Sequence, residues 1–248
     1  MKTSMAAIMA ASILPSFATA QDAPDQDLTF TYGIGVVGLS GVYVGQDDEL
    51  LPFPVLGVSY GQWSLSIAKG IEFQAIATPT TRMSFALVYD PAADMPDTQL
   101  FADLDREDGA AFEIEGSHDF GIFDIAAVVR RDVSQRHDGV GGDFSLGRSA
   151  LIGQTLIEGR VGASYLDQYY GNALYGVGAN EANALRASYD LDESWSPFVE
   201  LSAIVPINDT TSFFAGFRHE QLSDEISNSP LVDADERTTL GLSLIRTF

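Results

Sequence analysis

Polar and apolar residues alternate along most of this chain, which is the pattern of strands with one apolar and one polar face. In residues 82–90, the apolar face carries Met83, Phe85 and Leu87, and the other face carries Arg82 and Ser84. No segment sustains the period of about 3.6 residues that marks an amphipathic helix. The pattern therefore predicts an all-β, antiparallel fold. Similar alternation is found at 112–119, 123–130, 157–165, 185–190, 195–205 and 213–220.

Short turns and long polar segments separate the predicted strands. We predict short connections at 60–62, 78–80, 192–194 and 206–209, and long loops at 91–108, 167–183 and 222–236. Short turns on one rim and long loops on the other are typical of transmembrane β-barrels. Counting gives about twelve strands, within a range of ten to fourteen and an even number.

The strand count conflicts with the position of one long loop. With about twelve strands, the long segment 91–108 falls on the rim that should carry short turns. A strand has therefore been split or missed. The segment 63–76 is where we expect this, because Lys69-Gly70 can form a turn inside it.

The first twenty residues have the three parts of a secretory signal peptide. Lys2 provides the basic region, Met5 to Leu14 the apolar run, and Ala18-Thr19-Ala20 the cleavage site. Cleavage would leave Gln21 as the first residue of one barrel domain, 21–248. The apolar run is shorter than the roughly 18 to 20 residues that a helical membrane span needs.

The net charge of the chain limits the kinds of partner that it can bind. The formal net charge is −22, and Lys69 is the one lysine that remains after removal of the signal peptide. Nucleic-acid binding needs a basic surface, so it is excluded as a function. The acidic loops either keep the protein soluble or bridge through divalent cations to anionic lipid headgroups. The chain has no cysteine, so hydrogen bonds and packing must hold the exported protein together.

Alternation alone does not say which face points inward, but the size of the barrel does. Twelve strands close too widely for side chains alone to fill the centre, so a soluble barrel with an apolar interior is disfavoured. The apolar faces should therefore meet lipid, and the charged faces should line a wet lumen in an outer membrane. The predicted lumen network is Arg82, Glu113, Glu115, Asp124, Arg130, Glu158, Arg160, Arg186, Glu200, Arg218 and Glu220, with Glu72 beside it.

The chain ends in an amphipathic strand with a terminal aromatic residue. Leu240, Leu242, Leu244 and Phe248 share one face of it. A terminal aromatic residue after such a strand is the feature by which the barrel-assembly machinery of the outer membrane recognises its clients. Arg246 replaces the usual apolar residue, and near the membrane surface its guanidinium can reach the headgroups.

No catalytic, cofactor-binding or metal-binding residues are predicted, and the chain is not expected to be an enzyme. Ser117, His118 and Glu115 could suggest a hydrolytic triad, but neighbours in a strand point to opposite faces. His118 and His219 fall on the apolar face, near a membrane interface. The acidic run 103–108 lacks the glycine-centred spacing of an EF-hand and is read as a solvated loop.

Several motifs, in this order, resemble the MipA/OmpV family of MltA-interacting outer-membrane proteins. They are Tyr43 to Asp48, Pro52-Phe53-Pro54, Tyr60, Asp138 to Gly142, Tyr169-Tyr170-Gly171 and Ser229 to Val232. The resemblance implies an outer-membrane barrel, and it implies a scaffold that joins a murein transglycosylase to a peptidoglycan synthase. Gln46 stands where the family often has serine.

Two functions remain open at this point. One is a scaffold of the cell envelope whose partners also include outer-membrane lipids and the assembly machinery. The other is a channel for small solutes, with the charged lumen as its filter. Carboxylates and arginines that pair across the lumen would favour the scaffold, and an unpaired acidic ring around open water would favour the channel.

Overall fold

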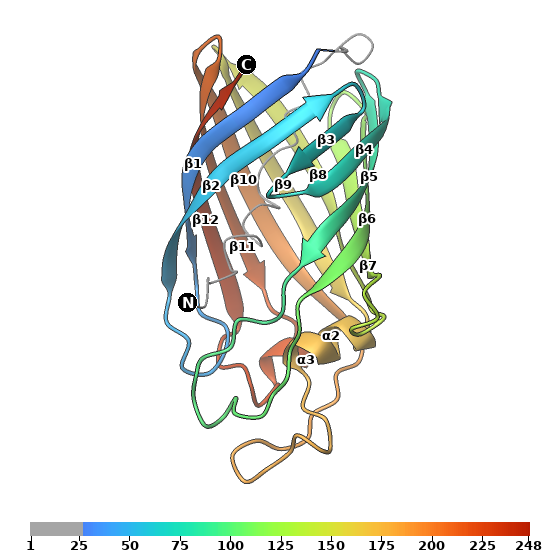
Figure 1. The fold of residues 1–248 in the computed structure, drawn as a ribbon, viewed down its shortest axis with the longest axis vertical. Helices are drawn as coiled ribbons and strands as arrows, with labels where there is room; N and C mark the ends of the chain where they lie inside the picture. The colour runs from blue at the N-terminus through green and yellow to red at the C-terminus, as the bar shows by residue number, and fades with distance from the viewer. Residues whose placement is uncertain (1–26) are drawn as a thin grey trace.

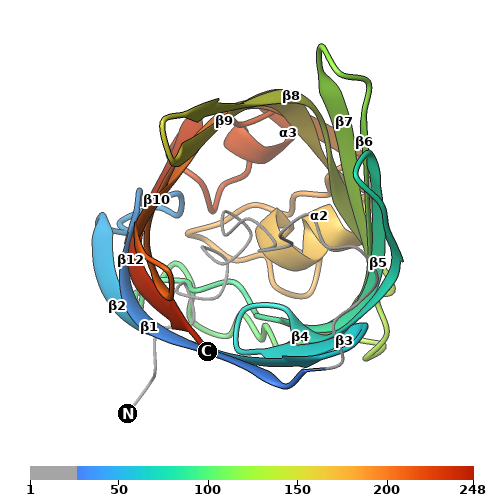
Figure 2. The same ribbon diagram turned by 90° about the horizontal axis from the view of Figure 1, so that it is seen from above.

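The computed structural model describes residues 27–248, which form a closed antiparallel barrel of twelve strands (Figures 1 and 2). The predicted fold class and strand number are confirmed. The predicted signal peptide and its cleavage site lie outside the described residues. The strands are β1 (Thr29–Leu39), β2 (Glu49–Tyr60), β3 (Trp63–Ser66), β4 (Gly70–Ala77), β5 (Thr81–Asp90), β6 (Gly109–Asp119), β7 (Asp124–Asp132), β8 (Val140–Ile152), β9 (Thr155–Leu166), β10 (Ser194–Asn208), β11 (Thr211–Gln221) and β12 (Glu236–Thr247).

Each strand pairs with its neighbours in sequence, and β1 pairs with β12 to close the ring. At this seam Thr31 lies opposite Thr247, and Leu39 lies opposite Thr239. At this seam, β1 and β12 are paired along their shared length, so neither strand has a free edge. This is important because unpaired backbone N–H and C=O groups are costly in hydrocarbon.

Short turns lie at one rim of the barrel and most of the long connections at the other (Figure 1). The segment 63–76 is split as predicted: β3 and β4 are joined by residues 67–69, and Gly70 has a positive φ of 64°. This turn restores the alternation of rims, so 91–108 lies with the other long loops. Two short helices, α2 (Gln168–Tyr175) and α3 (Asp224–Ser227), lie in the long loops. No helix among residues 27–248 is long and apolar enough to cross a membrane.

Two predictions about the segment 183–194 are wrong. Residues 185–190 form no strand, and 192–194 is not a short turn. Residues 185–193 belong to a single long connection between β9 and β10 that contains α2, and Ser194 already begins β10. The alternation at 185–190 is matched only by an isolated bridge between Val177 and Tyr189, because this segment folds back on its own loop.

The apolar faces of the strands point outward. Leu87, Ile125 and Leu201 are 49%, 41% and 54% exposed, whereas Ser84 and Ser202 on the inner face are buried. Aromatic residues lie near both ends of this apolar band, as in membrane barrels. They are Tyr32, Tyr60, Trp63 and Phe248 near the short turns, and Tyr89, Tyr165 and Trp195 near the long loops.

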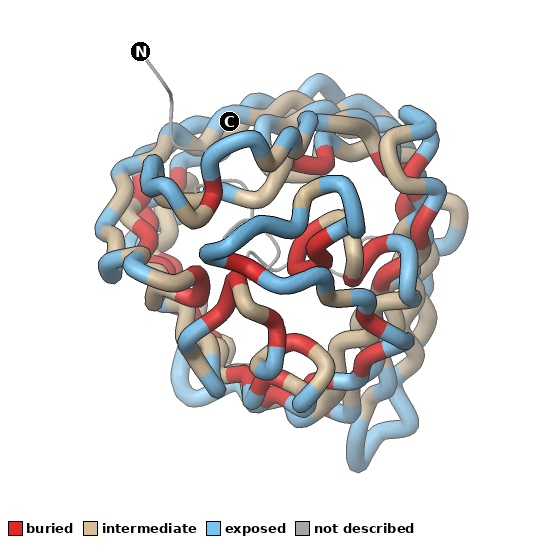
Figure 3. The backbone as a smooth tube through the Cα atoms, turned by 90° about the horizontal axis from the view of Figure 1, so that it is seen from below, coloured by how far each residue is buried: buried red, intermediate tan, exposed pale blue. Residues whose placement is uncertain are grey.

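The main hydrophobic core lies in the long loops rather than inside the barrel. These loops pack together across one end of it, as seen from below in Figure 3. We call this cluster the cap. Its buried members are Val42, Tyr43, Phe101, Tyr170, Leu174, Tyr175, Val177, Leu191, Leu222, Ile226, Leu231 and Val232.

Candidate functional site

The barrel lumen holds a cavity of about 430 Å³ with a charged wall. The alternation of the strands directs most of the charged side chains of this wall into the lumen. The cap forms the floor of the cavity through residues such as Tyr43 and Tyr175. Nine carboxylates line the cavity against six cations. The carboxylates are Glu72, Asp90, Asp94, Glu113, Glu115, Asp143, Glu158, Glu200 and Glu220, and the cations are Lys69, Arg82, Arg130, Arg160, Arg218 and Arg237.

The first ionic cluster joins the β3–β4 turn to β6 and β7. Lys69 Nζ lies 3.1 Å from Glu113 Oε1 and also pairs with Glu115. Arg130 Nη2 approaches the other oxygen of Glu113 at 3.3 Å. Since Glu113 is almost completely buried, these two cations offset the large cost of desolvating its charge.

The second cluster is centred on Arg160 of β9. Its guanidinium pairs with Glu158 on the same strand and with Asp124 on β7, and it donates to Ser145 Oγ at 3.2 Å. The guanidinium therefore bridges across β8, which lies between β7 and β9. Several donors in one planar group suit arginine to this role.

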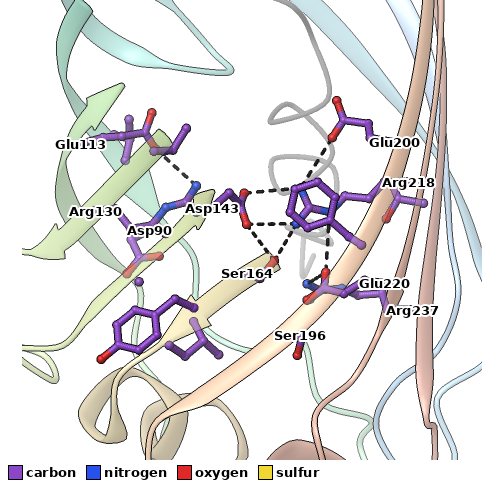
Figure 4. A pocket seen from close by; sticks show the side chains of 18 of the residues that line it. Asp90, Glu113, Arg130, Asp143, Ser164, Ser196, Glu200, Arg218, Glu220 and Arg237 are labelled. Carbon is purple, nitrogen blue, oxygen red and sulfur yellow. Dashed lines mark hydrogen bonds and ion pairs between the residues drawn. The ribbon is translucent and has the colours of Figure 1, made fainter. Parts of the chain in front are cut away.

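The third cluster is the largest and is shown in Figure 4. Arg218 of β11 pairs with Asp143 at 3.0 Å and with Glu200 and Glu220 at 3.6 Å each. Arg237 of β12 approaches Glu220 at 2.8 Å. These contacts join β8, β10, β11 and β12 through the lumen.

Aromatic packing adds to this cluster. The guanidinium carbon of Arg218 lies 3.7 Å from the ring centroid of Phe198, which is a cation–π geometry. The ring covers the guanidinium while the carboxylates surround it. Arg218 is therefore fixed in place, and its charge is not free to attract ions from solution.

The part of the lumen lined by β1, β2 and β12 is different. Phe53 and Val55 of β2 point inward, as do Phe214 and Ile245, and Val55 packs against the latter pair. The ring of Phe53 lies directly over Gly35 of β1, where a Cβ would come within 2.3 Å of a ring carbon. The lumen therefore has an apolar side and a charged side.

A polar junction fixes the cap to the barrel at Asp90, the last residue of β5. Asp90 accepts hydrogen bonds from Arg136 at 2.6 Å and from the Tyr170 hydroxyl at 2.7 Å. His137 Nε2 lies 3.4 Å from the same carboxylate and packs against the Tyr170 ring. Burial, together with the negative charge of Asp90, raises the pKa of Tyr170 well above its usual range, so the hydroxyl remains a donor.

This junction does not have the geometry of a hydrolase. The Ser134 hydroxyl donates to Asp132 at 2.6 Å rather than to His137. A nucleophilic serine needs its hydrogen bond to the imidazole base. The contacts of Asp90, Asp132 and His137 instead hold the β7–β8 loop against the cap.

Ten of the eleven residues predicted for the lumen network lie on inward-facing strand positions. They are Arg82, Glu113, Glu115, Asp124, Arg130, Glu158, Arg160, Glu200, Arg218 and Glu220. Arg186 is the exception and corrects the prediction. It lies in the β9–β10 loop, buried, and donates to the carbonyls of Leu100, Ala102 and Glu181. There it holds two cap loops together.

The sequence prediction missed three members of the lumen clusters. Lys69 lies at a turn, Asp143 lies in a glycine-rich stretch, and Arg237 stands at the start of the last strand. Alternation extended backward from Ser145 and Thr239 would have placed Asp143 and Arg237 on the inner face. Nothing in the sequence places Lys69, because its direction depends on the turn.

The other predicted residues have clear positions. Leu240, Leu242 and Leu244 are outward and exposed, and Phe248 stacks on Tyr32 with ring centroids 5.5 Å apart. Their role as an assembly signal stays a prediction. His118 and His219 also point outward and contact the hydroxyls of Thr81 and Thr238. In the acidic loop, Arg106 pairs with Glu181 at 2.7 Å.

The comparison that decides the family is the match of residues 32–248 to the model of the MltA-interacting protein MipA. The chain belongs to the MipA family. It is 26% identical over 210 residues to the MltA-interacting protein of Escherichia coli K12, covering 82% of this chain and 84% of that one. It is 28% identical over 155 residues to the "Putative outer membrane protein YiaT" of E. coli O157:H7. The matched region spans 62% of this chain and 62% of that relative.

Solved structures of low sequence identity match this chain with TM-scores below 0.5. An anion-selective porin from Comamonas acidovorans matches with a TM-score of 0.43 and 9% identity, over 90% of this chain and 99% of that one. The COG4313 outer membrane channel from Pseudomonas putida F1 matches with a TM-score of 0.42 and 10% identity, over 95% and 100%. With the family match and the outward apolar band, the family member described here is a protein of the outer membrane.

Proposed function

We propose that this MipA-family barrel is a structural and interaction protein of the cell envelope rather than an open pore. The observation that carries this proposal is the pairing of charges across the lumen. Lys69 pairs with two carboxylates of β6, and Arg160 and Arg218 each pair with carboxylates of more than one strand. Such a network stiffens the wall, and the charges held inside its clusters are not free to act as an ion filter.

The cap supports the same proposal. Its buried apolar residues extend across the loop end of the barrel, with Leu231 and Val177 among the most buried side chains of the described chain. A charge placed within this packed apolar cluster would lose its hydration, which is strongly unfavourable. Among the described residues, the short-turn end has no cluster of comparable size.

We propose that partners bind at the short-turn rim, which faces the periplasm in outer-membrane barrels. Two neighbouring hairpins present exposed apolar side chains there, and Arg148 Nη1 donates to Ile122 O at 3.3 Å to connect them. We call these side chains the rim patch: Phe120, Ile122, Phe123, Leu151 and Ile152. From the name of the E. coli relative, the MltA-interacting protein, we propose a murein transglycosylase as the partner. From the family resemblance of the sequence motifs, we propose that the same assembly includes a peptidoglycan synthase.

Two measurements test this proposal. In planar bilayers, the purified protein should give no steady single-channel steps, and regular large steps would favour the small-solute channel. For the partner, the protein should co-purify with a murein transglycosylase after mild cross-linking of whole envelopes. Ile122→Asp should reduce that co-purification. Leu185→Asp, an exposed residue in a loop at the opposite end, should not. Equal recovery with both variants would refute the rim patch.

A further inference from the structure

The barrel wall is incomplete between β2 and β5. Strand β3 pairs with β2 only over Gly57–Tyr60, and β4 pairs with β5 only up to the pair Ile71 and Leu87. The β3–β4 hairpin therefore ends partway down the wall (Figure 1). Below it, residues 49–55 of β2 and 88–90 of β5 face each other with no strand between them. We call this opening the β2–β5 window.

The window is framed on all sides by described residues. The β3–β4 turn closes it above, where Ile67 N donates to Leu56 O at 3.1 Å. At the loop end, Gln46 Nε2 donates to Asp94 O at 3.3 Å and joins the two loops that border the opening. These contacts give the window a defined size and position.

The lumen cavity reaches the window. Its lining includes Ala68 and Lys69 from above and Val88 from the side. It also includes Tyr89, which lies on the outward face of β5 and is 39% exposed. The lining of the cavity therefore extends from the lumen wall to the residues that frame the window.

The window opens at the height of the apolar band. The outward side chains beside it, Leu50, Leu56 and Leu87, are 73%, 51% and 49% exposed. On a membrane barrel, such residues face lipid chains. A molecule that uses the window would therefore come from the membrane and not from water.

The open edge of β2 is adapted to remain unpaired. Leu56 directs its carbonyl toward β3, so alternate residues, including Pro54 and Pro52, direct their backbone groups to the same side. Proline has no N–H, so two donors that would otherwise be unsatisfied in hydrocarbon are absent. Proline also blocks pairing with an added strand. The edge thus favours an opening over a docking site for another sheet.

The lining behind the window selects the chemistry of a ligand. On the β2 side, Phe53 and Val55 are not among the residues that line the cavity, but they point inward and present an apolar surface to the lumen. On the β4 side, Glu72 lines the cavity and accepts a hydrogen bond from Ser64 at 3.2 Å, and it forms no ion pair among the described residues. With nine carboxylates against six cations, the lining attracts a positive group.

We propose that the β2–β5 window is a lateral entrance through which a cationic amphiphile passes from the outer membrane into the lumen. Its hydrocarbon chain lies along Phe53 and Val55, and its protonated amine pairs with Glu72. This route needs no passage through the cap, so the inference stands independently of the proposed scaffold function.

The experiment uses the full-length protein in lipid vesicles and dodecylamine that carries a diazirine on its chain. After irradiation, mass spectrometry should find cross-links on the peptide that contains Phe53. Glu72→Gln should reduce this labelling about tenfold, the size expected when one charged hydrogen bond is lost. Ala68→Trp should reduce it by obstructing the window. Ala163→Trp, on the outward face of β9, is the matched control and should leave the labelling unchanged.

Dodecanoate with the same diazirine distinguishes charge-selective entry from nonspecific hydrophobic binding. It should label the lumen far less than the amine does. Equal labelling by both probes, or labelling confined to the outer residues Leu50 and Leu56, would overturn the proposal. Heat-dependent migration on gels confirms that each variant forms a barrel, so loss of labelling cannot be attributed to misfolding. Bilayer conductance is measured separately, and its outcome bears only on the scaffold function.

Discussion

The hydroxyl of Tyr170 in α2 donates a hydrogen bond to Asp90 Oδ1 over 2.7 Å, which joins the cap to the last residue of β5. Tyr170→Phe removes this donor without removing the ring. Because the Asp90 side chain is nearly buried, we expect the cap to lose about 1–3 kcal/mol of local stability. Hydrogen exchange of amides in α2 should report this as faster opening.

The neighbouring Tyr169 provides a matched control. It is 57% exposed, so Tyr169→Phe should leave exchange in α2 unchanged. If both variants behave like the wild type, the contact with Asp90 does not hold the cap.

Arg218 lies among three carboxylates, so its replacement should be costly. Arg218→Gln removes the cation that pairs with Asp143 and Glu200. We expect this change to lower the unfolding free energy in lipid vesicles by about 3–5 kcal/mol. Arg218→Lys should recover part of the loss because it restores the charge but not the planar donors. Arg148→Gln, on the exposed short-turn rim, should cost little. A similar small loss for Arg218→Gln would contradict the structural role of the network.

Ile125 and Ala126 are adjacent in β7 but point to opposite sides of the wall. Ile125 is 41% exposed on the outer face, whereas Ala126 lines the lumen cavity. Ile125→Arg should lower the unfolding free energy by about 2–4 kcal/mol, the cost of a charge near mid-membrane. Ala126→Arg should cost clearly less because carboxylates and water can solvate it. Denaturant titration in vesicles measures both, and equal or reversed losses would invert the faces.

The contact between Arg106 and Glu181 makes part of the cap sensitive to acid. Hydrogen bonds from Arg106, at 2.7 and 3.2 Å, hold the pKa of Glu181 below its ordinary value. A carboxyl with a depressed folded-state pKa stabilises the fold above its unfolded value of about 4.3, and this contribution disappears as the pH falls through the folded-state pKa. Proteolysis of the 91–108 and 176–193 loops by an acid-active protease should therefore accelerate below about pH 4.

Glu181→Gln tests the origin of this effect. The variant has no carboxyl at this position, so its loops should be cleaved more readily at neutral pH and should show a weaker dependence on acid. A pH profile identical to that of the wild type would assign the effect to other groups.

Phe248 is predicted to act in assembly more than in stability. It stacks on Tyr32, and its backbone exchanges two hydrogen bonds of 3.0 Å with Phe30. Deletion of Phe248 should lower the yield of heat-modifiable barrel in the outer membrane while total expression stays the same. Leu240→Ala changes an outward residue of β12 far from the end and should have a smaller effect on yield. Equal yields with and without Phe248 would refute the assembly signal.

The strands could be predicted from sequence because each has one lipid-facing and one lumen-facing side. Alternation puts Leu87 and Ile125 on the apolar faces, and the size of the barrel predicts that these faces meet lipid. The structure confirms that both residues are exposed. The turn at Lys69-Gly70 was inferred from the order of the rims, since a closed barrel must alternate between its two ends.

The cap and its partners could not be predicted in the same way. Arg186 follows an alternating pattern, but its segment belongs to a loop whose backbone bonds are made within the cap. Helix α2 is eight residues long, too short to show a clear helical period. Such segments depend on contacts between distant loops, which no local pattern records.

The pairing of β1 with β12 also determines the order in which the molecule can form. Eleven of the twelve seams join strands that are consecutive in sequence, so hairpins can form as soon as both strands are available. The twelfth joins Thr31 to Thr247, and its loop-closure entropy is the greatest of all. Until the last strand arrives, β1 carries an unpaired edge that lipid cannot satisfy. The rate at which β1 and β12 meet should therefore limit folding. Until then, another molecule must pair with the free edge of β1 in place of β12.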